Sequence, residues 1–204
     1  MAKIHPQAHN SSDVPCYLTS RRETFTIWMK SLILNGNGCT VFDANGQVVY
    51  RVDNYNSKCS NEVQLMDLKG DVVCTILRKR VKLFLGTWEG YRSIDAEIGK
   101  VRKPDFQVRK AFSTLRGEAS ASKVIVGSDR DQSYECMIES WSKGSSGFKI
   151  IDKTGKVIAE VKRKESRSGV ALGKDVLTMV VEACVDHSLI MGLVIVNGLI
   201  SSKM

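Results

Sequence analysis

One segment near the end of the chain, VDHSLIMGLVIVNGLI (Val185–Ile200), is apolar on almost every face of a helix. A helix that is hydrophobic all round must lie inside a protein core or a membrane. About 14 residues rise only ~21 Å, which is short of the ~30 Å hydrocarbon layer, and Asn197 and Gly198 interrupt the apolar run. Asp186 suits the N-cap, because its carboxylate accepts bonds from free backbone N–H groups. The segment therefore predicts a buried core helix, with a buried strand and a membrane segment as the alternatives.

Three other segments share one pattern: an apolar residue, Asp, two residues, Gly, one polar residue and two β-branched residues. They are Phe42–Val49, Met66–Val73 and Ile151–Ile158. Asp supplies an acceptor for backbone N–H groups in a turn, and Gly supplies the positive φ that closes it. The pattern predicts three antiparallel hairpins, in which Asp43, Asp67 and Asp152 are turn residues rather than catalytic carboxylates.

Further runs of alternating or β-branched residues raise the expected number of strands to between ten and twelve, with little helix elsewhere. So many strands must stack as two sheets or close into a barrel to hide their edges. These runs are Glu23–Met29, Phe106–Arg109, Lys123–Val126, Tyr134–Trp141 and Leu177–Val181.

The length of the chain suits one large domain or two small ones. The chain has 204 residues, 43% hydrophobic and 25% charged, which are ordinary values for a globular protein. We expect residues 1–20 to be a flexible N-terminal tail and residues 21–204 to form the domain. The tail lacks the apolar core of a secretory signal, and the six cysteines are never closer than 15 residues. Both features predict a cytoplasmic protein with reduced thiols.

Residues suited to catalysis are scarce. The chain has three histidines, and His5 and His9 fall in the expected tail. We expect His187 to be a hydrogen-bonded residue at the start of the helix. Neither a phosphate-binding glycine loop nor a pair of catalytic carboxylates is recognisable. The sequence therefore predicts a non-enzymatic protein that needs no cofactor and no metal.

Positive charge is the strongest functional signal, since the net charge is +8 and the pI about 9.2. Two triplets follow the Gly of a predicted hairpin by seven or eight residues, so equivalent hairpins would place them at comparable rims. Lysines and arginines gathered at a rim attract the phosphates of lipid headgroups or nucleic acid. The alternative is a charged outer face that only keeps the sheet soluble. The triplets are Arg78, Lys79, Arg80 and Lys162, Arg163, Lys164.

The sequence resembles the LURP-one-related proteins, a plant family. The resemblance extends from about Thr24 to Val196, and its most specific part is Leu-Gly-Lys-Asp followed by Val-Asp and an apolar tail. The chain differs from the family at Ala183, where proline is common, and after the helix, where acidic residues are usual. The matching segments are Val41–Gly46, Leu83–Arg92, Leu172–Asp175, Val185–Asp186 and Leu189–Val196.

The resemblance implies a tubby-like fold: a closed antiparallel barrel of about twelve strands around a central hydrophobic C-terminal helix. It also implies kinship with phospholipid scramblases and with tubby proteins, which bind phosphoinositides and have been viewed as membrane-tethered transcription regulators. The founding member is tied to plant defence against an oomycete. No catalytic residue is established for the family.

These observations lead to two functional hypotheses. In the first, the chain is a non-enzymatic binding protein whose two basic triplets contact anionic phosphoinositide headgroups in a defence pathway. In the second, it is a protein-interaction module without a lipid ligand, and the basic patches only solvate it. Under both we expect a monomer without a transmembrane span. We expect it in the cytoplasm, with the membrane periphery and the nucleus as further locations, and without direct binding to nucleic acid, because Trp28, Trp88 and Trp141 form no recognition motif.

Overall fold

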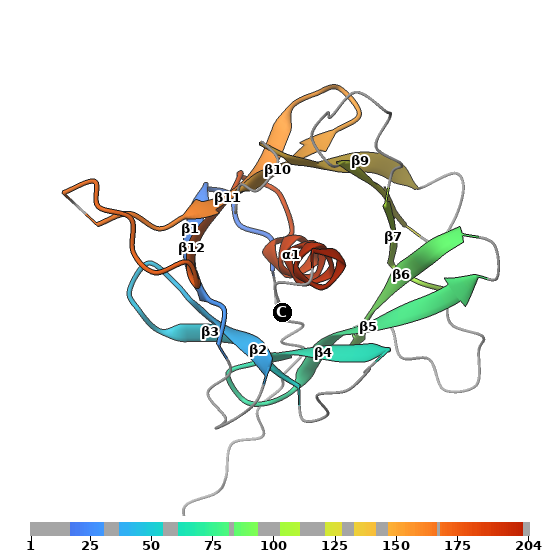
Figure 1. Cartoon of the computed structure of the whole chain (residues 1–204), viewed down its shortest axis with the longest axis horizontal. Helices are drawn as coiled ribbons and strands as arrows, with labels where there is room; N and C mark the ends of the chain where they lie inside the picture. The colour runs from blue at the N-terminus through green and yellow to red at the C-terminus, as the bar shows by residue number, and fades with distance from the viewer. Residues whose placement is uncertain are drawn as a thin grey trace, which may run out of the picture.

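The structure, a computed structural model, describes residues 17–30, 37–54, 61–81, 84–93, 103–110, 121–127, 133–141, 147–166 and 168–201. Twelve strands surround one helix (Figure 1). The strands are β1 (Glu23–Trp28), β2 (Asn37–Phe42), β3 (Val48–Asn54), β4 (Glu62–Asp67), β5 (Val72–Val81), β6 (Phe84–Arg92), β7 (Phe106–Lys110), β8 (Ala121–Val126), β9 (Tyr134–Ser140), β10 (Phe148–Asp152), β11 (Val157–Arg163) and β12 (Val176–Val181), and the helix is α1 (His187–Ile200).

The strands form a closed antiparallel barrel. Each strand pairs with the next in sequence, and β1 closes the barrel against β12 with a register that runs from Glu23 opposite Val181 to Trp28 opposite Val176. Closure removes every exposed sheet edge. The expected barrel of about twelve strands is confirmed. The five further strand-like runs correspond to β1, β7, β8, β9 and β12.

The three repeated segments are hairpin turns, as predicted. Asp43 Oδ1 accepts hydrogen bonds from the backbone N–H groups of Asn45, at 2.9 Å, and Gln47, at 2.8 Å. Asp152 accepts the equivalent two bonds in its own turn, and Asp67 accepts one of them. The closing glycines have φ angles of +80°, +92° and +86°, which L side chains adopt only with strain. They are Gly46, Gly70 and Gly155.

Helix α1 lies inside the barrel, surrounded by the wall on all sides (Figure 1). Twelve strands about 4.8 Å apart and tilted by about 40° give a barrel roughly 24 Å across. That width accommodates one layer of inward side chains and a helix about 10 Å in diameter. Ile190, Leu193 and Ile195 of the helix are fully buried. The core-helix interpretation of this segment is therefore confirmed, and the strand and membrane-segment alternatives are wrong.

The contact between the helix and the wall depends on two glycines. Gly90 of β6 faces Phe106 of β7, and a Cβ at Gly90 would lie 2.1 Å from the Phe106 ring. The same ring lies against Gly192 of α1, where a Cβ would be 3.1 Å from it. The absence of both side chains lets Phe106 fill the space between the wall and the helix.

The two ends of the barrel are distinct. Because neighbouring strands are antiparallel, all odd-numbered strands run in one direction and all even-numbered strands in the other. One end, the turn rim, carries the three Asp-Gly turns and the start of α1. The opposite end, the loop rim, is where β1, β5 and β11 finish and β12 begins.

The expected N-terminal tail is described from Tyr17 onward, and residues 1–16 lie outside the described residues. Tyr17 packs against the core, and Leu18 forms an isolated β-bridge with Asp186. Thr19 accepts a backbone hydrogen bond from Cys184. The described part of the expected tail, from Tyr17, therefore contacts the barrel close to the start of the helix.

Candidate anion-binding rim

The two basic triplets lie at the same rim but on opposite walls. Residues 78–80 are near the end of β5, and residues 162–164 are at the end of β11, so both belong to the loop rim. In the closed order of twelve strands, β5 and β11 are six positions apart in either direction. Across a barrel roughly 24 Å wide, one headgroup cannot contact both triplets. The expectation of comparable rims fits the structure, and a single concavity lined by all six residues does not.

The β5 triplet is partly engaged by neighbouring side chains. The Arg78 guanidinium lies over the Trp88 ring, 5.7 Å from its centroid, in a cation–π arrangement. Lys79 Nζ lies 4.0 Å from Glu89 Oε2, at the limit of an ion pair. Arg80 belongs to β5, and its side chain is outside the described structure. Arg78 and Lys79 are both exposed, so their charges are accessible to a surface at this rim.

The β11 triplet differs residue by residue. Lys162 is exposed and lies 3.9 Å from Glu160 on its own strand. Arg163 is half-buried, and its Nε is shielded from solvent. Lys164 Nζ donates a hydrogen bond to Thr26 Oγ1 at 2.6 Å. Lys162 is therefore the most accessible of the three charges.

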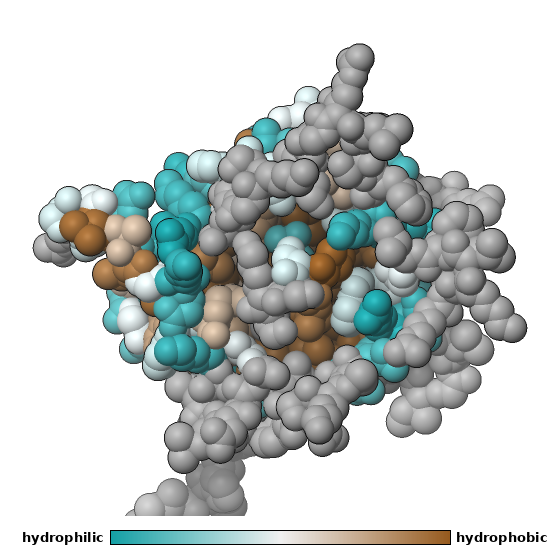
Figure 2. All heavy atoms as spheres, in the orientation of Figure 1, coloured by the Kyte–Doolittle hydropathy of each residue, from teal (hydrophilic) through white to brown (hydrophobic). Residues whose placement is uncertain are grey.

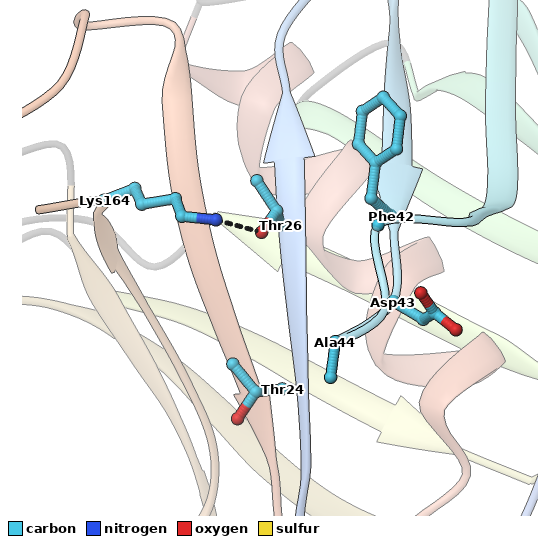
Figure 3. Close-up of a pocket in the computed structure, with 7 residues that line it drawn as sticks. Thr24, Thr26, Phe42, Asp43, Ala44 and Lys164 are labelled. Atoms are coloured by element: carbon cyan, nitrogen blue, oxygen red, sulfur yellow. Dashed lines mark hydrogen bonds between the residues drawn. The ribbon is translucent and has the colours of Figure 1, made fainter. Parts of the chain in front are cut away.

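A shallow pocket adjoins Lys164 on the outer wall (Figure 3). Its volume is about 400 Å³, and its lining residues are Thr24, Thr26, Phe42, Asp43, Ala44, Gly46 and Lys164. Figure 3 shows the Asp43 carboxylate turned away from Lys164 and Thr26. One ammonium already bonded to a threonine hydroxyl provides at most a weak contact for an anion.

The two rims differ in charge. Among the described side chains near strand ends and connections, cations outnumber carboxylates at the loop rim, whereas carboxylates outnumber cations at the turn rim. The loop rim carries Lys30, Arg78, Lys79, Arg109, Lys110, Lys149, Lys162, Arg163, Lys164 and Lys174 against Asp53, Glu62, Glu139, Glu165 and Asp175. The turn rim carries Glu23, Asp43, Asp67, Asp71, Asp105, Glu135, Asp152, Glu182 and Asp186 against Arg21, Arg22, Lys69, Arg92, Lys103, Lys153 and Lys156.

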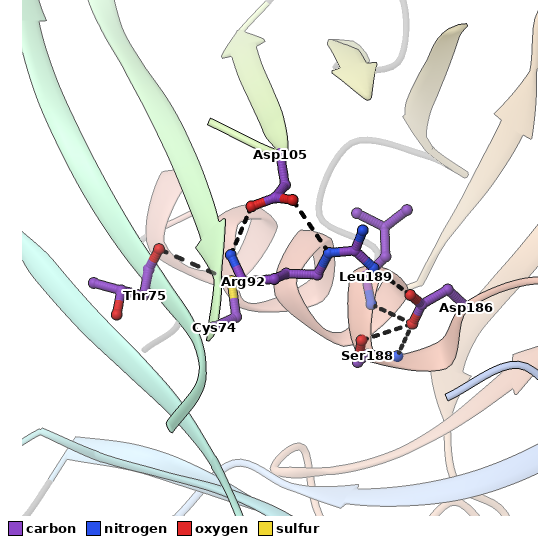
Figure 4. A network of polar contacts seen from close by, with 7 residues as sticks. All are labelled: Cys74, Thr75, Arg92, Asp105, Asp186, Ser188 and Leu189. Atoms are coloured by element: carbon purple, nitrogen blue, oxygen red, sulfur yellow. Dashed lines mark hydrogen bonds and ion pairs between the residues drawn. The ribbon is translucent and has the colours of Figure 1, made fainter. Parts of the chain in front are cut away.

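A polar network at the turn rim holds the start of the helix (Figure 4). Asp186 Oδ1 accepts bonds from Ser188 N, at 2.8 Å, Ser188 Oγ, at 2.6 Å, and Leu189 N, at 3.1 Å. Asp186 Oδ2 accepts a bond from Arg92 Nη1, and Asp105 Oδ2 accepts one from Arg92 N at 2.7 Å. The predicted N-cap is confirmed. The network satisfies helix N–H groups and places the partly buried Arg92 guanidinium between the carboxylates of Asp105 and Asp186, which is a structural role.

His187 also has a structural environment, as expected. The Tyr50 hydroxyl lies 2.8 Å from His187 Nδ1, and the rings of Tyr17 and Phe25 lie within 5.6 Å of the imidazole. Burial lowers the pKa of His187 from its ordinary value of 6.5, partly opposed by the charges of Glu23 and Asp186.

Two buried thiols are unsuited to act as nucleophiles at neutral pH. Burial raises the pKa of Cys39 to about 12 and that of Cys136 to about 12, so both remain protonated. Within the described ranges, His, Cys, Asp and Glu side chains nowhere gather in threes that could hold a metal ion. In the same ranges, no helix combines the length and apolar character needed to cross a bilayer.

Comparison with known proteins gives consistent matches along the chain. The family model described as LURP-one-related matches residues 23–197. Protein LURP-one-related 11 of Arabidopsis thaliana is 49% identical over 209 residues, covering 98% of this chain and 89% of the relative. Protein LURP-one-related 4 of the same plant is 42% identical, covering 98% and 87%. An X-ray structure of an Arabidopsis thaliana protein matches with a TM-score of 0.60 at 16% identity, covering 91% of this chain and 94% of that one, which supports the fold.

Proposed function

The chain belongs to the LURP-one-related family, and from this premise we propose that it is a non-enzymatic regulatory protein whose loop rim binds anionic phosphoinositide headgroups at a membrane surface. The unequal distribution of charge between the two rims supports this proposal. A barrel with randomly scattered surface charge would have similar rims, whereas among the described residues cations exceed carboxylates at the loop rim and carboxylates exceed cations at the turn rim.

The separation of the triplets favours a distributed contact rather than a deep headgroup pocket. Each Lys or Arg near an anionic bilayer contributes about 1 kcal/mol, and the attraction decays within a Debye length. Cations on opposite walls of one rim can face the same flat surface together although they cannot share one headgroup. Binding should therefore depend on lipid charge density and weaken with salt.

The absence of enzymatic activity is part of the proposal. Its support is that the titratable groups described in the barrel interior have evident structural partners or are kept neutral by burial. Asp186 caps the helix and pairs with Arg92, His187 bonds to Tyr50, and Cys39 stays protonated. Such groups are not free to act as a nucleophile or a general base.

Vesicle co-sedimentation tests the binding proposal. Purified protein is mixed with phosphatidylcholine vesicles, alone or containing phosphatidylinositol bisphosphate. Alanine replacement of residues 78–80 or of residues 162–164 should each lower partition roughly ten- to a hundred-fold at low salt. The matched control replaces three exposed turn-rim lysines, K69A/K153A/K156A, and changes net charge equally. Equal loss in the control and in the triplet variants would reject the loop rim as the contact surface.

A protein-interaction module is the second candidate, and one observation favours it. Met137 lies on β9, and Trp141 comes directly after the end of that strand. Both are large exposed hydrophobic residues. Exposed aromatic and methionine side chains are typical of protein interfaces. M137S/W141S variants that lose a captured partner, with no vesicle binding by the wild type, would favour this function.

Pathway and location belong to the same proposal. By resemblance to the family, we propose a role in plant defence for a monomer in the cytoplasm, at the membrane periphery or in the nucleus. Plants lacking the protein should then be more susceptible to an oomycete pathogen. Restoration by the wild-type chain but not by the two-triplet alanine variant would link that role to the rim.

A further inference from the structure

The connection between β11 and β12 forms a small hairpin that projects from the barrel wall at the loop rim, at the left of Figure 1. Its geometry is well defined by hydrogen bonds. Glu165 and Ala171 form a β-bridge, Leu172 N donates to the Lys164 carbonyl at 2.8 Å, and Val170 N donates to Ser166 Oγ at 3.1 Å. Because these bonds join its two arms, the hairpin is a preformed feature.

The arm of the hairpin that follows the turn carries aliphatic side chains that the barrel does not bury. Val170 is 64% exposed and Leu172 is 40% exposed, with the exposed Ala171 between them. Figure 2 shows hydrophobic residues on this projection, next to a column of hydrophilic residues on the wall. Aliphatic side chains on a projecting turn contribute nothing to the core and expose apolar area to water.

Cations and an interfacial aromatic residue surround the base of the hairpin. Lys162 and Lys174 are exposed on either side of the tip in sequence. Trp28, at the end of β1, donates from Nε1 to Asp175 Oδ2 at 3.2 Å, and Lys30 Nζ lies 3.1 Å from the same oxygen. Tryptophan side chains with one apolar and one hydrogen-bonding edge favour the membrane–water interface.

We propose that this hairpin is a membrane-insertion element. Val170 and Leu172 enter the boundary between headgroups and acyl chains of an anionic bilayer, while Lys162, Lys174 and Lys30 contact lipid phosphates. The proposal rests on the proposed function, and it adds an apolar contact and a defined orientation of the barrel. Membrane affinity of such elements combines buried apolar area with attraction to anionic lipid.

The shape and charge of the hairpin favour a bilayer over a protein groove. Val170 and Leu172 are exposed on the arm that follows the turn, Lys162 and Lys174 flank the hairpin in sequence, and the facing arm carries the exposed carboxylate of Glu165 opposite Ala171. The excess of cations over this carboxylate complements a deformable surface with negative headgroups above an apolar layer. Two aliphatic side chains alone bind too weakly to anchor a protein, so binding requires the cations as well and is reversible. The hairpin and its cations lie at the same rim as the basic triplets, next to the β11 triplet and across the barrel from the β5 triplet.

The first experiment measures partition into phosphatidylcholine vesicles that contain phosphatidylserine. V170S/L172S keeps every charge and should reduce partition about ten-fold, as partial burial of two aliphatic side chains would. The control is L68S, because Leu68 is 68% exposed in the turn between β4 and β5 at the opposite rim. L68S should bind like the wild type, and unchanged thermal unfolding should show that all variants are folded.

The second experiment detects insertion directly. L172W should show a blue-shifted tryptophan emission with anionic vesicles and quenching by brominated acyl chains, whereas L68W should show neither beyond the wild-type background. The insertion proposal fails if V170S/L172S binds vesicles as well as the wild type and L172W is not quenched. The proposed function still stands in that case, provided that the wild type binds and the triplet variants bind weakly. No binding of the wild type to anionic vesicles overturns both. Loss of a captured protein partner in V170S/L172S without quenching in L172W overturns insertion in favour of a protein groove.

Discussion

The guanidinium of Arg92, at the end of β6, donates a hydrogen bond to the carboxylate of Asp186, the N-cap of the central helix. The same carboxylate accepts bonds from the first free N–H groups of the helix. One aspartate therefore links the start of the helix to the barrel wall. The link matters because the helix is apolar on all faces. It has no polar face that would fix its orientation within the barrel.

Replacing Asp186 tests this link. D186A removes the cap, which costs about 1 kcal/mol, and leaves the partly buried Arg92 without this partner, which costs about 1–3 kcal/mol more. D186N should be milder, since asparagine also caps helices. Urea unfolding followed by tryptophan fluorescence gives both free energies. If D186A and D186N unfold at the wild-type midpoint, the network does not hold the helix.

The contact between Gly90 and Phe106 is the tightest in the barrel interior among the glycines described. G90A places a methyl group 2.1 Å from the ring, so the ring or the wall must move. Overpacking of this kind costs typically about 1–3 kcal/mol. We expect a lower midpoint for G90A and partial recovery in G90A/F106L, because the smaller side chain frees the space. Additive losses in the double variant would show that the two sites do not share this contact.

Local features of the sequence predict much of the fold. The Asp-x-x-Gly turns are defined by a few adjacent residues, and the helix by its composition and the Asp186 cap, so both are recognisable without a structure. Barrel closure is different, because the register between Glu23 and Val181 joins segments from opposite ends of the chain. The residues alone indicate sheets that must hide their edges, and the family resemblance supplies the closed form.

The candidate site was predictable only in part. Equivalent hairpins correctly indicate that both triplets follow strands running in the same direction, and hence share a rim. Their placement on opposite walls follows from the number and order of all the strands, which no local pattern contains. The Lys164–Thr26 bond joins residues 138 positions apart and has no signal in the sequence. The exposed Val170 and Leu172 could have been noticed as aliphatic residues in a glycine-containing turn between basic residues.

His187 should make stability depend on pH. Desolvation lowers the pKa of the folded imidazole below the ordinary value of 6.5. As the pH falls below 6.5, the imidazole is therefore protonated in the unfolded chain before it is protonated in the folded chain. Proton binding then favours the unfolded chain, so the free energy of unfolding decreases as pH falls from 6.5 toward the folded pKa. The urea midpoint should decrease between about pH 7.5 and pH 5.5. H187F keeps an aromatic ring beside Tyr17 and Phe25 and should show a smaller decrease. Equal pH dependence in both proteins would exclude His187 as the titrating group.

A charge in the middle of the helix is the most direct test of its position. Leu193 is fully buried within the barrel, so the ammonium of L193K would have to be desolvated without a partner or expelled together with the helix. Either outcome costs several kcal/mol, comparable to the whole stability of a domain. L193K should therefore fail to yield a monomer with a cooperative unfolding transition.

Two variants serve as controls. L193M nearly conserves volume and should lower the free energy of unfolding by less than about 1.5 kcal/mol. L68K makes the same chemical change on an exposed turn and should leave stability nearly unchanged. Size-exclusion chromatography and thermal unfolding distinguish these outcomes. A monomeric, cooperative L193K with the wild-type midpoint would mean that the helix does not occupy the barrel.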